Sequence, residues 1–287
     1  MEPRRATIIQ SFRGLGTRRL NMPAVQLEAV GKVYRHRPVW FNWLGRERGG
    51  ETRALAGISL DVEAGRVLVL LGPNGSGKTT TLKLISTMLL PDEGRVLVQG
   101  FDTLRDPQEV RQRVGFAVAT ERSFFPRLSA RENLDFFAAL NDVPRKLRTE
   151  RIDELLTRTG LLDAGDTLVM KFSSGMYQRL GIARALIHRP SIVLLDEPTR
   201  SLDPGSAVQF WNMVRELPTQ GATVVLATHN FNEAVEVGNH VAVLLHGSLA
   251  AERALSANTR VDELRSFYFQ TTRELEEVEP VPVQESR

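Results

Sequence analysis

Short, continuous runs of apolar residues recur along the chain and predict strands buried in a parallel sheet. The run Val67–Leu71 comes early, and the run Ile192–Leu195 comes much later. Runs that are apolar at every position are typical of strands covered on both faces. Two more strands are expected near residues 223–228 and 241–245, and all four would belong to one core sheet.

Three other segments have the period of half-buried strands. Residues 24–30 and 58–62 alternate between apolar and polar positions, and so does Arg95–Val98. Strict alternation is typical of a strand with one face on a core and one face in water. These segments predict a small antiparallel layer beside the core sheet.

A long middle segment, from about Ser129 to His188, has helical patterns. Ser129 and Glu132 form a capping box, which marks a helix start, just before an apolar stretch. Gly175–Ile187 is a second candidate helix. With strands on both sides of this segment, the pattern predicts an α/β fold.

A glycine-rich loop follows the first apolar run. Residues 72–79 fit the pattern G-x-x-x-x-G-K-[ST], and a helix start follows them. Glycines let the backbone approach a phosphate closely, and N–H groups at a helix start bind the anion. Lys78 is expected to reach the β- and γ-phosphates, and the Thr79 hydroxyl is expected to hold Mg²⁺. The core is therefore predicted to be that of a P-loop NTPase, RecA-like in architecture. The expected nucleotide-binding residues are Gly72, Pro73, Asn74, Gly75, Ser76, Gly77, Lys78, Thr79 and Thr80.

Two acids end the later apolar run. Asp196 follows Ile192–Leu195 directly, and Glu197 comes next. Asp196 is placed for a second contact with Mg²⁺, usually through water, and Glu197 can polarise a water that attacks the terminal phosphate. Either acid could be an ordinary strand-end charge, but the spacing from the glycine-rich loop favours the metal and catalytic roles.

The order of the motifs resembles that of the ATP-binding cassette (ABC) transporter family, over roughly residues 24–250. Five motifs carry the resemblance. They are the Walker A loop (residues 72–79), the signature run Phe172–Gln178 with Ser173, Ser174, Gly175 and Met176, the Walker B strand with Asp196 and the catalytic Glu197, the D-loop Ser201–Asp203, and a switch histidine, His229.

The resemblance implies a subunit that binds and hydrolyses ATP with Mg²⁺. The helical segment, at about residues 125–188, is expected to be the family's inserted subdomain. Two cassettes are expected to pack head to tail, so that the signature of one cassette acts on the ATP held by the other. A homodimer is the expected assembly.

The same resemblance implies roles for single residues. Lys78, Glu197 and His229 are expected to be catalytic. Asp203 either links the two ATP sites or is a turn carboxylate before the next helix, and the two interpretations are equally good. Tyr34 stands where the family has an aromatic that stacks on adenine, with simple packing as the alternative.

Three departures from the family pattern stand out. The family usually has a glutamine, in contact with Mg²⁺, after the strand that precedes the helical segment; here Thr120 or Glu121 is the candidate substitute. We hypothesise that Glu121 takes part in coupling to a membrane partner. Ser174 and Met176 replace the usual glycine and glutamine of the signature. Arg200 occupies a D-loop position that is usually small.

Composition limits the possible partners. The 287 residues have room for one cassette, the net charge of +3 does not point to nucleic acid, and the absence of cysteine excludes disulfides and thiol metal sites. No apolar stretch approaches the ~18 residues of a membrane span. The translocation path is therefore expected in a separate integral membrane permease, with this chain on the cytoplasmic face of the membrane as a peripheral subunit.

The departures also resemble cassettes that pair with ABC-2 type membrane proteins, which are mostly exporters. An insertion at residues 35–53, rich in arginine and aromatic residues, either touches membrane or partner or packs on itself. Two alternatives remain open. Instead of an exporter subunit, the chain could be a soluble ABC ATPase acting on ribosomes, DNA or a protein complex, or a catalytically weak cassette that pairs with an active one.

The two ends are expected to lie outside the cassette. Residues 1–23 form a basic arm, with five arginines and one acid before Met22, and Met22 is itself a candidate natural start. Residues 251–287 form a short extension. Its acidic stretch, Glu274–Pro280, is expected to be a solvated tail.

Overall fold

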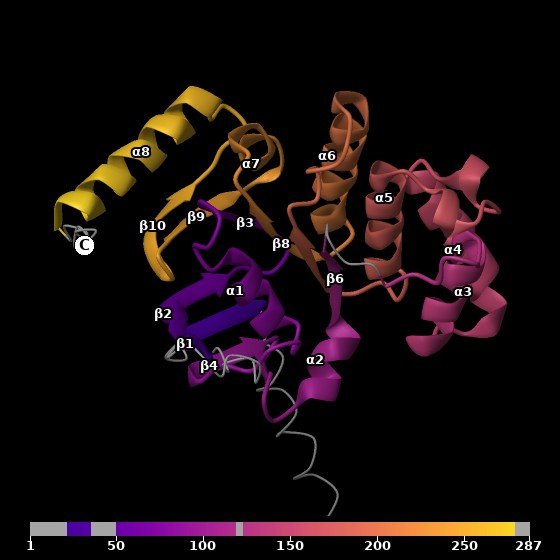
Figure 1. Cartoon of the computed structure of the whole chain (residues 1–287), viewed down its shortest axis with the longest axis horizontal. Coiled ribbons are helices and arrows are strands. Elements are labelled where there is room, and N and C mark those ends of the chain that lie inside the picture. The colour runs from indigo at the N-terminus through magenta and orange to yellow at the C-terminus, as the bar shows by residue number, and fades with distance from the viewer. Residues whose placement is uncertain (1–21, 36–49, 119–122, 279–287) are drawn as a thin grey trace, which may run out of the picture.

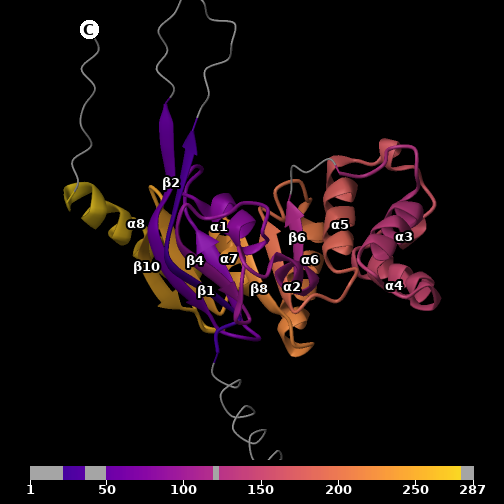
Figure 2. The same cartoon turned by 90° about the horizontal axis from the view of Figure 1, so that it is seen from below.

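The computed structural model describes residues 22–35, 50–118 and 123–278, and these contain two sheets (Figures 1 and 2). The larger sheet has the strand order β10-β9-β3-β8-β7-β6. Its inner strands pair in parallel, and β10 pairs antiparallel to β9 at the edge. The strands are β3 (Val67–Leu71), β6 (Val114–Val118), β7 (Ile192–Asp196), β8 (Thr223–Thr228), β9 (His240–Leu245) and β10 (Ser248–Ala254).

Every residue of β3, β7 and β8 is buried, which confirms the continuous apolar runs as central parallel strands. The register brings their carboxyl ends together, because Leu71 pairs with Thr228 and Asp196 pairs with Ala227. The glycine-rich loop, the two acids and His229 all follow these strand ends. They therefore meet at one edge of the sheet, where open α/β folds bind their ligands.

The second sheet is antiparallel, with the order β2-β1-β4-β5, and it confirms the predicted small layer. Its first two strands are longer than predicted, because Arg35 still pairs with Glu51 at their far ends. At these far ends the exposed side chains of Arg35 and Glu51 form a cross-strand ion pair at 3.0 Å. The strands are β1 (Val25–Arg35), β2 (Glu51–Val62), β4 (Glu93–Val98) and β5 (Phe101–Asp102).

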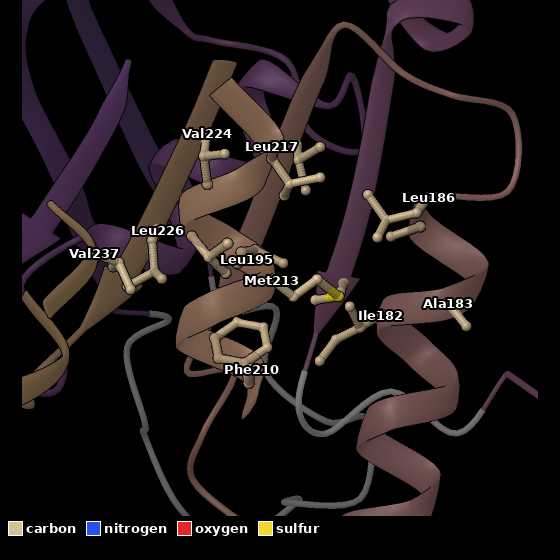
Figure 3. Packing of buried hydrophobic residues seen from close by; sticks show 14 of the residues in the cluster. Ile182, Ala183, Leu186, Leu195, Phe210, Met213, Leu217, Val224, Leu226 and Val237 are labelled. Carbon is tan, nitrogen blue, oxygen red and sulfur yellow. The ribbon is translucent and has the colours of Figure 1, made fainter. Parts of the chain in front are cut away.

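The larger sheet is covered on both faces. On one face its residues pack with the small antiparallel sheet and α1 (Lys78–Ile85) and α2 (Pro107–Arg113). On the other face lie α5 (Ser174–Ala185), α6 (Pro204–Thr219) and α7 (Phe231–Val237). Figure 3 shows the second contact, where Leu195 and Leu226 of the sheet meet Phe210 and Met213 of α6.

The middle segment is helical, as expected. Helices α3 (Ala130–Leu140), α4 (Arg145–Arg158) and α5 stand together beyond β6 in both views (Figures 1 and 2). The predicted capping box is present: the Glu132 amide donates to Ser129 Oγ at 3.2 Å, and the Ser129 amide donates to Glu132 Oε2 at 2.7 Å. Two short 3₁₀ turns, Leu162–Ala164 and Val169–Lys171, complete this part.

The C-terminal extension contains a helix that the sequence analysis did not predict. Helix α8 (Val261–Val278) packs on α7, with Leu264 fully buried and the Tyr268 ring 5.3 Å from the Phe231 ring. The expected acidic tail from Glu274 is helical as far as Val278, and Glu274 is exposed, so its solvation stays a prediction for the rest of the stretch. The apolar spacing of Leu264 and Tyr268, one helical turn apart, was the available signal.

Several predictions fall on residues outside the described ranges. These are the basic arm up to residue 21, most of the insertion at residues 36–49, the pair Thr120 and Glu121, and the end of the chain from residue 279.

Candidate functional site

A cavity of about 430 Å³ lies at the sheet edge where the strand ends meet. It is lined by residues from both sheets and from α1. The larger sheet and its loops contribute Asn74, Gly75, Gly77, Val118, Asp196, Glu197 and Arg200; α1 contributes Lys78, Thr79, Thr80 and Lys83; the antiparallel sheet contributes Tyr34, Thr52, Arg53 and Ala54.

The glycine-rich loop is packed so tightly that two of its glycines cannot be replaced without strain. A Cβ on Gly72 would lie 2.3 Å from the carbonyl oxygen of Leu244. Gly77 has a φ of +105°, a conformation that favours glycine, and a Cβ there would lie 2.5 Å from the Leu55 side chain. The loop is thus held as a backbone cradle at the start of α1.

Lys78 lies beneath this loop and is 5% exposed. Its Nζ donates to the carbonyl oxygens of Gly72 at 2.7 Å and Pro73 at 2.9 Å, and it lies 4.0 Å from Glu197 Oε1. Burial lowers the pKa of the Lys78 ammonium, and the Glu197 and Asp196 carboxylates oppose that shift. The fixed positive charge therefore sits between the loop and the two acids.

Asp196 is buried at the end of β7, and its carboxylate faces α1. The Thr79 hydroxyl donates to its two oxygens at 2.9 and 3.1 Å. Burial raises the pKa of the Asp196 carboxyl, and the Thr79 hydrogen bond partly offsets this. A cation bound between these two side chains would favour the ionised carboxylate.

Glu197 lies in a turn between Asp196 and the D-loop, with a left-handed backbone (φ 48°) that L-residues rarely adopt. The Glu197 amide still donates to the Ala227 carbonyl, at 2.9 Å, so the turn stays attached to β8. His229 Nδ1 lies 2.9 Å from the Glu197 carboxylate. The His229 ring is largely exposed, at 60%, and its contact with Glu197 places it at the same strand ends as the cavity.

Tyr34, at the end of β1, lines the opposite side of the cavity. Its hydroxyl lies 3.3 Å from Thr80 Oγ1, so its ring stands beside the start of α1. This places an aromatic side chain where a base could stack, as the sequence analysis expected. The base-stacking role itself stays a prediction.

The four signature residues do not line the cavity of their own chain. Ser173 caps α5, since its hydroxyl accepts a hydrogen bond from the Met176 amide at 3.2 Å. A Cβ on Gly175 would lie 3.0 Å from the Ser201 carbonyl, so the signature helix passes close to the D-loop. Ser174 is the first residue of the helix. Their predicted action on a second cassette's ATP is compatible with this separation.

Of the two interpretations of Asp203, the contacts within this chain favour the turn carboxylate. Its carboxylate caps α6 by accepting from the Ser206 amide at 3.0 Å and from the Ser206 hydroxyl at 2.6 Å. These hydrogen bonds lower the pKa of the Asp203 carboxyl. The role of Asp203 in linking two ATP sites stays a prediction.

Gln178 is a residue to which the sequence analysis gave no role of its own. It belongs to α5, is 5% exposed, and its amide nitrogen donates to the carbonyl oxygens of Glu197, at 3.0 Å, and Pro198. Its Oε1 accepts from the Ser201 amide at 3.1 Å. One side chain of the signature helix thus holds both ends of the turn that carries Glu197. The place of Gln178 in the signature run was the available signal in the sequence. Only the fold shows that its side chain contacts the turn of Glu197.

Replacing Gln178 with leucine is expected to lower the free energy of unfolding by about 2–4 kcal/mol, because buried groups of the turn lose their partner. It is also expected to lower kcat for ATP hydrolysis by roughly tenfold, with little change in KM, because Glu197 loses its fixed position. Urea denaturation and steady-state ATPase assays measure the two effects.

The matched control for this variant is Gln209→Leu, on the exposed face of α6. It should leave both quantities unchanged. If Gln178→Leu loses stability while kcat stays at the wild-type value, Gln178 has no positioning role in catalysis.

The geometry is that of a nucleotide site, and comparison with known proteins identifies its family. The family model described as ABC transporter matches residues 55–200, just over half of the chain. The chain belongs to the ABC transporter family. It is an ATP-binding cassette of that family, and this confirms the predicted P-loop fold with its antiparallel layer and inserted helices.

The cassette is similar to curated transporter subunits. It is 39% identical over 206 residues to the daunorubicin resistance ATP-binding protein DrrA3 of Streptomyces coeruleorubidus, a match covering 72% of this chain and 65% of that protein. It is 38% identical over 205 residues to the ABC transporter ATP-binding protein NatA of Bacillus subtilis (strain 168), covering 71% of this chain and 83% of NatA. The match thus spans slightly less than two thirds of the length of DrrA3.

A solved structure has the same fold. The ATP-binding cassette MJ0796, in a dimeric post-hydrolysis state bound to ADP and Pi, is 29% identical with a TM-score of 0.71; the match covers 81% of this chain and 99% of that one. In the part of this cassette that the structure describes, no helix has both the length and the apolar character needed to cross a membrane.

Proposed function

We propose that this cassette is the ATP-binding and ATP-hydrolysing subunit of an ABC-2-like membrane exporter. The observation that carries the proposal is the position of the Glu197 carboxylate, 2.9 Å from His229 Nδ1 and 4.0 Å from Lys78 Nζ, at a cavity that also holds the glycine-rich loop. This arrangement provides a base, a partner that orients it and a fixed cation next to a phosphate cradle.

In the proposed reaction, water attacks the γ-phosphorus of ATP. The bond from the water oxygen to phosphorus forms while the bond from phosphorus to the bridging oxygen of ADP breaks, and ADP leaves with that electron pair. Glu197 accepts the proton of the attacking water, and His229 orients the Glu197 carboxylate and the phosphate. Lys78 and the loop N–H groups stabilise the charge that moves to the phosphate oxygens.

Mg²⁺ is the expected metal, and the residues fit it. The Thr79 hydroxyl and the Asp196 carboxylate lie 2.9 Å apart and offer the hard oxygen donors that Mg²⁺ prefers, with substrate phosphates and water completing its ligands. When bound, Mg²⁺ would neutralise charge on the phosphates. The proposed nucleotide-binding set is the predicted one, residues 72–80 with Tyr34 stacking on the base.

The proposed active form is a dimer. The signature residues Ser173, Ser174, Gly175 and Met176 are away from their own cavity, so in the proposal they donate to the γ-phosphate of a second, identical cassette. The dimeric state of the MJ0796 cassette supports this assembly. We place the cassette at residues 24–250, its helical subdomain at about 125–188, and a C-terminal extension from 251.

The proposed partner is a separate integral membrane permease, with the cassette on the cytoplasmic face of the membrane. The names of the relatives support this assignment: DrrA3 is a daunorubicin resistance protein, and NatA is named as an ABC transporter ATP-binding protein. We propose that the transport is export, that the permease is of the ABC-2 type, and that the cassette is a peripheral subunit. A nucleic-acid partner is not proposed.

The test is to purify the tagged full chain from solubilised native membranes and to identify the proteins present in stoichiometric amount. The expected result is one integral membrane protein, with ATPase activity in the complex. Recovery with ribosomes, DNA or a soluble complex, and with no membrane protein, would reject the transporter assignment in favour of a soluble ABC ATPase.

A further inference from the structure

Arg200 is a charged residue at the nucleotide cavity to which the proposed mechanism gives no role. It follows the Walker B acids by a few residues, at a D-loop position that is usually small in the family. Its side chain lines the same cavity as Lys78, Thr79, Asp196 and Glu197. Arg200 therefore borders the cavity that the glycine-rich loop and the two acids also border.

Backbone contacts fix the position of Arg200 relative to the proposed catalytic base. The Arg200 amide donates to the Glu197 carbonyl at 3.2 Å, so both residues belong to one tight turn. Gln178 holds this turn at Glu197 and at Ser201, on either side of Arg200. The backbone that bears the Arg200 guanidinium is therefore held in place next to Glu197, the proposed catalytic base.

The charge of Arg200 is available to a ligand. Two guanidinium groups line the cavity, and Arg53 is already paired with Glu93 at 3.0 Å. Arg200 is exposed and, among the described residues, forms no ion pair. Among the described residues the permanently charged Arg200 guanidinium thus has no ion-pair partner at the cavity that Asp196 and Glu197 also line, a position that suits a ligand with several negative charges.

We propose that Arg200 is a catalytic residue whose guanidinium donates hydrogen bonds to the γ-phosphoryl oxygens of ATP bound in the same chain. The inference rests on the proposed hydrolysis and deepens it. As the γ-phosphoryl group passes from the ADP oxygen to water, the charge on its three other oxygens rearranges. A planar guanidinium offers two parallel donors to those oxygens, which a lysine cannot do.

The experiment compares the full wild-type chain with Arg200→Ala and Arg200→Lys. Arg200→Ala is expected to lower kcat about 100-fold, with KM for ATP changed less than about threefold, since one transition-state donor is lost. Arg200→Lys is expected to lie between the two. Free guanidinium ion in the millimolar range should restore part of the activity of Arg200→Ala and none of Arg200→Lys.

Ligand binding gives a readout independent of turnover. Affinity for ADP with aluminium fluoride, which imitates the γ-phosphoryl group in transfer, should fall about 100-fold in Arg200→Ala, while affinity for ADP alone stays at the wild-type value. The matched control is Arg145→Ala, an exposed arginine at the start of α4, which should change neither.

The outcomes separate this inference from the proposed function. An active wild-type chain with an equally active Arg200→Ala overturns the role of Arg200 and leaves the ATPase proposal standing. Equal loss of affinity for ADP and for ADP with aluminium fluoride, without guanidinium rescue, also overturns it, because Arg200 then acts only in ground-state binding or in folding. A wild-type chain that hydrolyses no ATP, alone or with its permease, overturns both.

Discussion

Replacing Glu197 with glutamine is expected to lower kcat for ATP hydrolysis by about a thousand-fold. Glutamine keeps the size of the side chain and a hydrogen bond to His229, now 2.9 Å from the carboxylate, but it cannot accept a proton from water. ATP binding needs no proton transfer, so the variant should still bind ATP. With hydrolysis blocked, the ATP-bound dimer should persist and elute as a dimer from a sizing column only when ATP is present.

Glu150→Gln, on the exposed side of α4, is the matched control and should behave as wild type. The two readouts test different parts of the proposal. Near wild-type turnover in Glu197→Gln would show that Glu197 is not the base. A variant that loses turnover but elutes only as a monomer with ATP would reject the homodimer.

Replacing Lys78 with alanine is expected to lower kcat/KM for ATP by about 10²–10³-fold. Lys78 is 5% exposed, and its Nζ is held beneath the loop by two loop carbonyls, 4.0 Å from Glu197 Oε1. The loss should appear in nucleotide affinity as well as in turnover, because Lys78 contacts phosphates in the ground state too. Equilibrium binding of ATP and steady-state kinetics separate the two contributions.

Lys146→Ala, an exposed lysine of α4, is the control for charge, and it should leave affinity and turnover unchanged. Thermal unfolding checks that Lys78→Ala is folded, since the variant removes one of the cations that stabilise the buried Asp196 carboxylate beside Glu197. A folded Lys78→Ala with wild-type ATP affinity and kcat would contradict the phosphate-binding role of the loop.

The charge balance of the site explains why these effects should be large. Asp196 and Glu197 stand next to each other, and burial already raises the pKa of Asp196. In this region a single ammonium, Lys78, lies within ion-pair distance of either acid among the described residues. Bound Mg²⁺ and the Arg200 guanidinium would add the positive charge that the phosphates require.

Much of this architecture follows from the sequence alone. The apolar runs Val67–Leu71 and Ile192–Leu195 identified the central strands, because a strand buried on both faces must be apolar at every position. The glycine-rich loop was recognisable because phosphate binding needs a fixed backbone shape, which only a glycine pattern permits. The order of five motifs along the chain was enough to indicate the family.

Local pattern was a poorer guide where backbone pairing or tertiary packing decides the structure. The start of β2 has no apolar alternation, and it is a strand because it pairs with the end of β1. Helix α8 extends to Val278, through residues that looked like a charged tail, because Leu264 and Tyr268 pack against the cassette. The start of β2 has no local signal of this pairing, whereas α8 has only the weak signal of two apolar positions one turn apart.

The sequence by itself determined the fold class, the family and the phosphate-binding loop, because each depends on local residue types or on motif order. Only the tertiary structure decided which side chains converge. The parallel register of β3, β7 and β8 brings Lys78, Glu197 and His229 together, and packing of α5 sets Gln178 on the turn of Glu197 and Arg200. These side-chain contacts depend on strand register and helix packing, which are properties of the whole fold and not of any one segment.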